Sequence, residues 1–141
     1  MANIGYMPED RRLVPRLSVE QNVLLPAWSA GIPDAAARLA SVYRAIPEVG
    51  EWRARKALHL SGGQQKLVAL ARAMMAGTRL LLLDEPFEGV APVLARRLAE
   101  VIAALRQTGL SAILSESSLA HAHGLLDRVF VIDRSAVSAK P

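Results

Sequence analysis

The sequence predicts an α/β fold in which a mostly parallel sheet carries an inserted, wholly helical unit. Residues 18–57 show only helical patterns, and the stretch 79–84 is an aliphatic run that ends in an acidic residue. From residue 60 onwards helical and strand patterns alternate, which is typical of an open sheet whose parallel strands are joined by helices. The chain of 141 residues is long enough for a single hydrophobic core.

Residues 3–17 are expected to form a short strand that leads into a loop, because they mix a glycine and two prolines with charged residues. The helical unit, residues 18–57, opens with the spacing of a capping box. In such a box the Ser18 hydroxyl accepts a hydrogen bond from the third helical amide, while the Gln21 side chain reaches back to the cap. We expect this first helix to run to about Ala30.

A second helix is expected in the same unit, capped by Asp34 and ended by Pro47. Trp28 and Trp52 are expected to be packing residues of the unit, because aromatic rings bury a large apolar area.

Residues 58–134 carry the rest of the predicted fold, including an aliphatic strand that we expect to be covered on both faces. The expected elements are a helix from Ser61 to Gly77, a strand over 79–84, a helix closed by Gly109, strands around 110–115 and 129–133 with a helical turn between them, and a tail over 135–141.

Composition excludes several classes of protein. Hydrophobic residues make up 52% of the chain and charged residues 21%, which excludes a disordered protein. No run approaches the roughly 18 consecutive apolar residues that a membrane-spanning helix needs. The net charge of +4 comes from dispersed arginines, so we expect no nucleic-acid partner.

The first chemical motif is a glycine-rich turn at the start of a predicted helix, Leu60-Ser61-Gly62-Gly63-Gln64-Gln65. Because Gly62 and Gly63 have no side chains, the backbone amides can come close to an anion. The Ser61 hydroxyl and the positive end of the helix dipole strengthen this attraction. The motif therefore indicates an anion-binding helix terminus.

The second motif is an aliphatic strand that ends in Asp84, Glu85 and Pro86. The strand fixes both carboxylates at its carboxyl end, where ligands bind in open α/β sheets. Asp84 is the candidate to hold a Mg²⁺ ion, directly or through water. Glu85 is the candidate to polarise the water that attacks a terminal phosphate.

Each motif alone has an ordinary structural interpretation. A Ser-Gly-Gly stretch is most often a loop, and an aliphatic strand followed by Asp-Glu is most often a strand and a polar turn. Their combination, with an apolar helix between them, is far more specific.

On these residues the chain resembles, over essentially its whole length, the nucleotide-binding subunit of an ABC transporter. Within that superfamily it most resembles the ATPases of branched-chain amino-acid importers. The stretches that carry the resemblance are Gly5 to Arg12 with Pro15 to Asn22, the signature turn at 60–65, the Walker B strand at 80–86, and Gly89-Val90-Ala91-Pro92.

The resemblance implies a fold and a function. The fold is the C-terminal part of a P-loop NTPase (RecA-like) core with an inserted all-helical ABC subdomain. The boundaries expected are a Q-loop segment at 1–17, the helical subdomain at 18–57, the signature helix with the C-terminal half of the core at 58–134, and the tail. The function is ATP hydrolysis, with ATP and Mg²⁺ as cofactors, that powers the import of amino acids or similar small solutes.

The resemblance also assigns roles to residues. Glu9 occupies the Q-loop position, which couples the nucleotide site to the membrane partner. Ser61, Gly62 and Gly63, with Gln64 completing the motif, contact the γ-phosphate of ATP held by the opposite subunit. Ser117 occupies the switch position, where most of the superfamily has histidine.

The partners implied are a transmembrane permease subunit and a second ABC ATPase subunit, in a homodimer or heterodimer. The location implied is cytoplasmic, peripheral on the inner face of the cell membrane.

The pattern departs from the superfamily in one main respect: the 141 residues contain no Gly-x-x-x-x-Gly-Lys-Ser/Thr sequence, which wraps the phosphates in P-loop ATPases. We therefore expect the chain to be a fragment that begins just before the Q-loop. We also expect it to be inactive alone, since Asp84 and Glu85 have no phosphate cradle beside them. Two alternatives remain: a non-catalytic module that docks to a permease or complements a complete ATPase, and a fragment of a soluble ABC ATPase acting on DNA or ribosomes.

Overall fold

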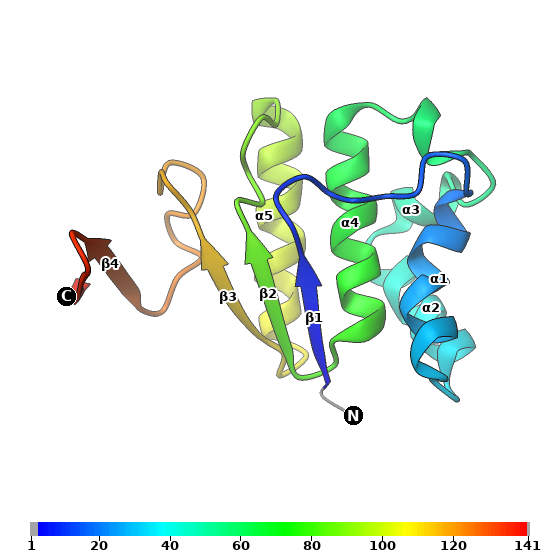
Figure 1. Cartoon of the computed structure of the whole chain (residues 1–141), viewed down its shortest axis with the longest axis horizontal. Coiled ribbons are helices and arrows are strands. Elements are labelled where there is room, and N and C mark those ends of the chain that lie inside the picture. The colour runs from blue at the N-terminus through cyan, green and yellow to red at the C-terminus, as the bar shows by residue number, and fades with distance from the viewer. Residues whose placement is uncertain (1–2, 141) are drawn as a thin grey trace.

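The architecture places a small parallel sheet between a helical unit and a separate hairpin (Figure 1). The computed structural model describes residues 3–140, so residues 1, 2 and 141 at the ends of the expected Q-loop segment and tail lie outside it. The helices are α1 (Val19–Ala30), α2 (Ala35–Ala45), α3 (Pro47–Glu51), the short 3-10 helix η1 (Ala57–His59), α4 (Gly62–Ala76) and α5 (Pro92–Arg106). The strands are β1 (Ile4–Met7), β2 (Leu80–Asp84), β3 (Ser111–Ser115), β4 (Val129–Asp133) and β5 (Ala136–Lys140).

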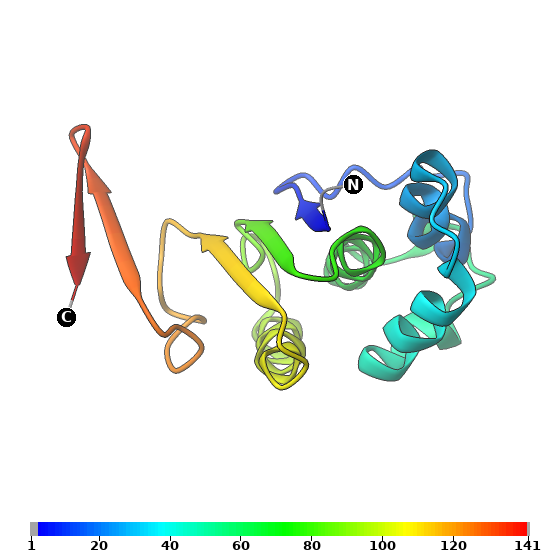
Figure 2. The ribbon, with the colours of Figure 1, turned by 90° about the horizontal axis from the view of Figure 1, so that it is seen from below.

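The parallel sheet has the order β1-β2-β3, with β2 in the centre. Leu81 is in register with Gly5 on one side and with Ala112 on the other. Helices α4 and α5 lie on the same side of this sheet (Figure 2). Leu81 and Leu83 are therefore buried against them, whereas the alternate residues of β2 are only half-buried. The expectation that β2 is covered on both faces is wrong for the described residues, because both covering helices take the same face.

Close packing of α4 on β1 depends on a glycine. A Cβ atom at Gly5 would lie 2.0 Å from the carbonyl oxygen of Ala73, far inside van der Waals contact. The absence of a side chain at Gly5 thus allows the helix backbone to rest directly on the strand.

The helical unit forms largely as predicted. Ser18 accepts a hydrogen bond from the Gln21 amide, and the Gln21 side chain accepts one from the Ser18 amide, which completes the capping box. Gly31 ends α1 in the left-handed conformation with φ of 60°. Two expectations are wrong: the Asp34 side chain does not cap α2 but accepts a hydrogen bond from Arg38, and the Trp28 side chain points away from the core with 57% of its surface exposed.

The C-terminal part differs most from the predicted order. Strand β4 does not join the parallel sheet but pairs antiparallel with β5. Strand β5 itself forms in the segment where a tail was expected. Arg134 and Ser135 form the turn between them, and both have positive φ. The segment between β3 and β4 forms turns instead of the expected helical turn.

None of the helices within residues 3–140 combines the length and the apolar character that crossing a membrane would require.

Candidate functional site

The acidic pair lies at the carboxyl end of β2, where the sequence predicts it. One carboxylate oxygen of Asp84 accepts a hydrogen bond of 2.5 Å from the Ser115 hydroxyl, and the other lies 3.4 Å from the Tyr6 hydroxyl. Ser115 ends β3 and Tyr6 lies on β1, so the two neighbouring strands hold the carboxylate between them. Asp84 is half-buried.

Glu85 follows in a left-handed backbone conformation, with φ of 45°. Its amide donates to the Ser115 carbonyl oxygen at 2.9 Å, which fixes the first residue after the strand. The Ser117 hydroxyl lies 3.4 Å from a Glu85 carboxylate oxygen. The structure therefore brings together Glu85, the candidate to polarise the attacking water, and Ser117 at the switch position.

Lys66 is a residue of this site that sequence reasoning missed. It lies in the second turn of α4 and is only 3% exposed. Its ammonium group donates to the carbonyl oxygen of Glu85 at 2.8 Å and to that of Glu9 at 3.1 Å. Burial, together with the positive charge of Arg11, lowers the pKa of Lys66. One buried cation thus ties the signature helix to both the Q-loop segment and the acidic pair, a tertiary link for which the sequence carries no local signal.

The signature turn is held by its own capping box. The Gln64 amide donates to the Ser61 hydroxyl at 3.2 Å, and the Gln64 side chain accepts from the Ser61 amide at 2.9 Å. Ser61 and Gly62 are exposed, so the N-terminus of α4 is open to solvent. This arrangement occupies the Gln64 side chain within the turn and leaves the first amides of α4 free for an anion.

The two glycines of this turn also serve packing within the chain. A Cβ atom at Gly62 would lie 2.9 Å from the Arg11 guanidinium, and one at Gly63 would lie 2.8 Å from the Leu94 side chain. Arg11 donates to the Gly62 carbonyl oxygen at 3.1 Å. The glycines therefore admit close contact with the Q-loop segment and with α5, in addition to the anion approach predicted from sequence.

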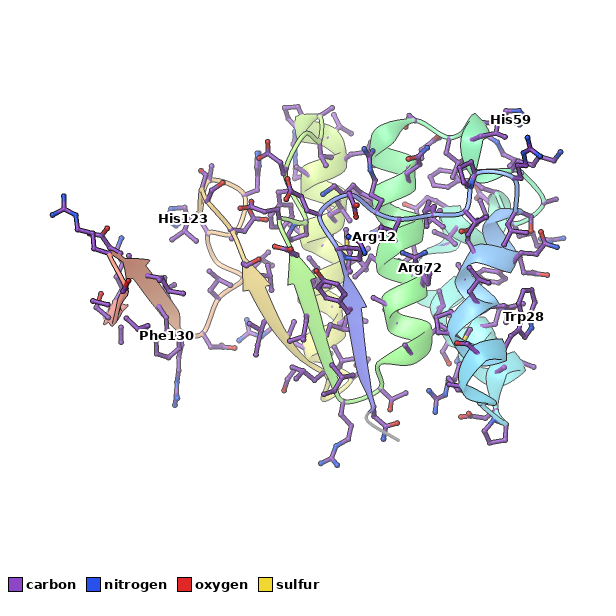
Figure 3. The ribbon with its side chains drawn as sticks, in the orientation of Figure 1. Arg12, Trp28, His59, Arg72, His123 and Phe130 are labelled. Carbon is purple, nitrogen blue, oxygen red and sulfur yellow. The ribbon has the colours of Figure 1, made fainter. Side chains whose placement is uncertain are left out.

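The loop that follows Glu9 has an unusual backbone. Arg11 and Arg12 both have positive φ, of 65° and 45°. The Arg72 guanidinium donates to the carbonyl oxygens of both, at 2.5 and 2.7 Å, and Figure 3 shows Arg72 beside Arg12. The side chain of Glu9 is exposed. Helix α4 thus fixes the shape of this loop through Arg72 and Lys66.

Glu116 is a second residue that sequence reasoning missed. Its carboxylate accepts a hydrogen bond of 3.1 Å from the Phe87 amide, just after the acidic pair. Burial, reinforced by the neighbouring carboxyl group of Glu85, raises the pKa of Glu116 to about 7. Phe87 itself is buried and its ring lies against that of His121, with centroids 5.9 Å apart. The large residue after the Asp-Glu-Pro sequence is therefore part of the core.

The donor set at this edge suits a magnesium ion that is shared with a phosphate ligand. No group of three acidic, histidine or cysteine side chains within residues 3–140 could enclose a metal ion. Mg²⁺ is, however, commonly held by one or two carboxylates together with waters and substrate phosphates. The single, well-oriented carboxylate of Asp84 fits that mode of binding.

Comparison with known proteins gives consistent matches. Residues 1–88, more than half of the chain, match the ABC transporter family. The high-affinity branched-chain amino acid transport ATP-binding protein BraG of Pseudomonas aeruginosa is 33% identical over 96% of this chain and 58% of its own length. The xylose import ATP-binding protein XylG of Paraburkholderia xenovorans is 36% identical over 93% of this chain and 27% of its own length.

Among solved structures, cbiO1 of Clostridium perfringens, described as part of the ABC transporter complex cbiONQ, superposes with a TM-score of 0.83 at 23% identity. The match covers 96% of this chain and 55% of that protein, so the chain spans between a quarter and about three fifths of the relatives compared. The match of residues 1–88 places this chain in the ABC transporter family.

Proposed function

We propose that the chain is a portion of an ATP-hydrolysing subunit of an ABC transporter, to which it contributes the signature turn and the acidic pair. The observation that carries the proposal is the position of Lys66. Its two hydrogen bonds tie α4, which begins with the signature turn, to the Glu85 and Glu9 backbones. If the glycine-rich turn and the end of β2 were unrelated structural features, a buried ammonium group shared between them would not be expected.

Each residue has a role in this proposal. Asp84 holds the magnesium ion, which when bound neutralises charge on the transferred phosphate. Glu85 accepts a proton from the attacking water, and the Ser117 hydroxyl 3.4 Å away orients its carboxylate. Electrostatic stabilisation and positioning supply most of the rate acceleration in phosphoryl transfer.

The signature turn acts across a subunit interface. The exposed Ser61 hydroxyl and the amides of Gly62 and Gly63 bind the γ-phosphate of ATP held by a second ABC ATPase subunit, identical or different. Gln64 supports this turn through its bond to the Ser61 amide. Glu9 lies in the loop that couples this site to the permease.

The partner outside the ATPase is a transmembrane permease subunit, so the chain works on the cytoplasmic face of the membrane. The helical unit is its docking surface in this proposal, and the exposed ring of Trp28 on α1 supports an interaction there. The solute is a small polar molecule, with branched-chain amino acids first, in keeping with the similarity to BraG.

By itself the chain should not hydrolyse ATP, because its 141 residues contain no Gly-x-x-x-x-Gly-Lys-Ser/Thr sequence. The test therefore joins the chain with the part of BraG that lies outside the matched region and measures turnover of Mg-ATP. We expect turnover that Glu85→Gln abolishes, whereas the exposed neighbour variant Glu88→Gln retains it. Turnover that both variants retain would contradict the proposal.

The same proteins also distinguish an ATP-hydrolysing role of this chain from the alternative that it is a non-catalytic interaction module. In that case the chain stimulates intact BraG in a way that depends on Ser61 but not on Glu85, and the joined fragments show no turnover.

A further inference from the structure

The first residue after β2 adopts a backbone conformation that is unfavourable for a residue with a side chain. Glu85 has φ of 45°, in the left-handed region. Such a conformation persists only where the surrounding structure fixes it, and it is found most often at functional sites. The backbone conformation of Glu85 also sets the direction of its side chain. The contacts that hold this turn therefore determine where the carboxylate points.

Backbone contacts fix the peptide groups on either side of Glu85. Its amide donates to the Ser115 carbonyl oxygen at 2.9 Å. Its carbonyl oxygen accepts from the Glu88 amide at 3.1 Å and from the Lys66 ammonium group at 2.8 Å. These bonds leave the amide of Phe87, in the middle of the turn, to be held by another group.

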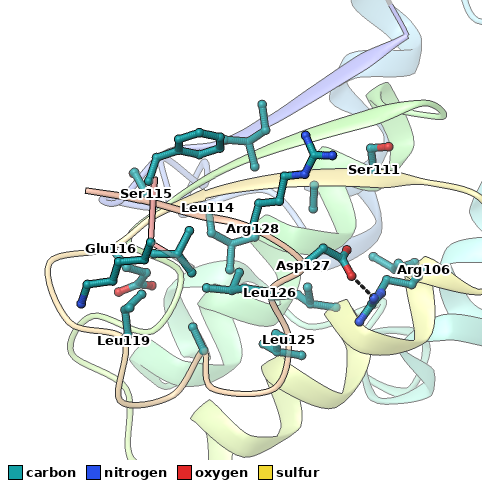
Figure 4. Close-up of a pocket in the computed structure, with 18 of the residues that line it drawn as sticks. Arg106, Ser111, Leu114, Ser115, Glu116, Leu119, Leu125, Leu126, Asp127 and Arg128 are labelled. Carbon is teal, nitrogen blue, oxygen red and sulfur yellow. Dashed lines mark hydrogen bonds and ion pairs between the residues drawn. The ribbon is translucent and has the colours of Figure 1, made fainter. Parts of the chain in front are cut away.

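That group is the side chain of Glu116, whose carboxyl oxygen accepts from the Phe87 amide at 3.1 Å. Glu116 directly follows β3, and its side chain is among those that line the pocket beside that strand (Figure 4). Its carboxyl group is half-buried and lies beside that of Glu85. The buried Phe87 ring packs against His121, which restrains the turn from another side. Glu116 therefore joins the segment after β3 to the turn that carries Glu85.

A second carboxyl group beside Glu85 is an unusual choice for a purely structural acceptor. Two neighbouring carboxylates repel each other, and a hydroxyl or amide side chain would accept the same bond without that cost. A carboxyl group retains an acceptor oxygen whether or not it is protonated. Burial, reinforced by Glu85, raises the pKa of Glu116 to about 7, and the bond to the Phe87 amide can therefore form on both sides of neutral pH.

We propose that Glu116 is a positioning residue for ATP hydrolysis. By accepting from the Phe87 amide it holds Glu85 in the left-handed conformation and keeps the Glu85 carboxylate aimed at the attacking water. Glu116 itself touches neither the nucleotide nor the water. The inference rests on the proposed function, which gives Glu85 the role of proton acceptor. It requires a hydrogen-bond acceptor at position 116 and no negative charge, so glutamine should serve in place of glutamate.

The first test needs no nucleotide. It compares the 141-residue chain with Glu116→Leu, which keeps much of the apolar volume but has no acceptor, and with Glu116→Ala, a second variant in case leucine does not fit. Glu116→Gln is the conservative variant, and Glu51→Ala, at an exposed glutamate of α3, is the matched control. NMR chemical shifts of Glu85 report its left-handed conformation, and hydrogen exchange reports the bond of the Phe87 amide.

We expect Glu116→Leu to move the Glu85 shifts away from left-handed values and to speed exchange at the Phe87 amide at least tenfold. In Glu116→Gln the Glu85 shifts should keep their left-handed values, and exchange at Phe87 should stay within threefold of that in the unaltered chain. Exchange at the Leu70 amide, inside α4, measures any general loss of stability. A change confined to the Glu85 turn separates positioning from that general effect.

The second test measures turnover of Mg-ATP by the chain joined with the part of BraG outside the matched region. Glu116→Leu should lower kcat at least tenfold and change KM less than twofold, because the carboxylate of Glu85 acts only after ATP has bound. Glu116→Gln should keep kcat within threefold of the unaltered protein, and Glu51→Ala should leave both constants unchanged.

Unchanged Glu85 shifts in Glu116→Leu and Glu116→Ala would overturn the inference, as would a rise in KM at unchanged kcat. An effect of Glu116→Gln as large as that of Glu116→Leu would also overturn it, because the negative charge and not the acceptor would then be required. An unaltered joined protein without turnover would contradict the proposed function instead. The Glu85 shifts and the Phe87 exchange would then decide whether Glu116 holds the turn.

Discussion

Replacement of Lys66 by methionine is the perturbation that most directly tests the link between the two motifs. Methionine retains much of the length and apolar volume of the lysine side chain but removes its ammonium group. The carbonyl oxygens of Glu9 and Glu85, which accept from that group at 3.1 and 2.8 Å, lose this donor. The backbones of both loops therefore lose their shared anchor on α4.

The expected loss of stability can be worked from these two bonds. A hydrogen bond to a charged group contributes about 1.5–3 kcal/mol. Methionine also avoids the desolvation of a buried ammonium, which offsets part of that loss. The net decrease in the free energy of unfolding is therefore about 2–4 kcal/mol, or a fall in the urea midpoint of roughly 1–2 M.

The assay is urea denaturation, combined with hydrogen exchange at the amides of Arg11 and Glu88, which pair with the Pro8 and Glu85 carbonyls. Both amides should exchange faster in Lys66→Met. Lys56→Met, at an exposed lysine, is the control and should stay within about 0.5 kcal/mol of the unaltered chain. A Lys66→Met chain as stable as this control would refute the reasoning.

Three further predictions concern stability. Because burial raises the pKa of Glu116 to about 7, the protonated carboxyl group contributes stability that is complete below the ordinary pKa of 4.5 and is lost as pH rises from there through about 7. Glu116→Gln should therefore flatten the pH dependence of the urea midpoint between about pH 4.5 and 7, and an unchanged slope would contradict this. Gly5→Ala should cost about 2–3 kcal/mol in chemical denaturation, because its Cβ would meet the Ala73 carbonyl, whereas Gly109→Ala, with open space around it and φ of 77°, should cost only about 1 kcal/mol; equal costs would argue against the close helix–strand contact. Ser61→Ala should lower the free energy of unfolding by about 1 kcal/mol through loss of the helix cap, and no loss would mean that the cap is not formed in solution.

Features that depend on local chemistry could be predicted from the sequence. Both capping boxes form because the serine and the glutamine that build each one lie three residues apart. The central strand could be located because a run of leucines between a helix and an acidic pair has few other stable conformations. The position of Asp84 and Glu85 at its carboxyl end follows directly.

Features that depend on pairing between distant segments could not be predicted. A helix lysine such as Lys66 is ordinarily exposed, and only the approach of the Glu9 and Glu85 backbones makes it a buried donor. Strand β4 has the aliphatic character of a core strand, but nothing in its sequence says which edge it pairs with. Strand β5 was missed because its turn, Arg134 and Ser135, contains none of the glycine or asparagine that usually marks a tight hairpin.

The most direct test of the central claim is binding and turnover of ATP by the purified 141-residue chain with magnesium and no partner. The account predicts neither, because this chain supplies a signature turn and an acidic pair but no phosphate-binding loop. Turnover that disappears in Glu85→Gln would contradict it, since residues 1–141 would then build a complete phosphate site by themselves.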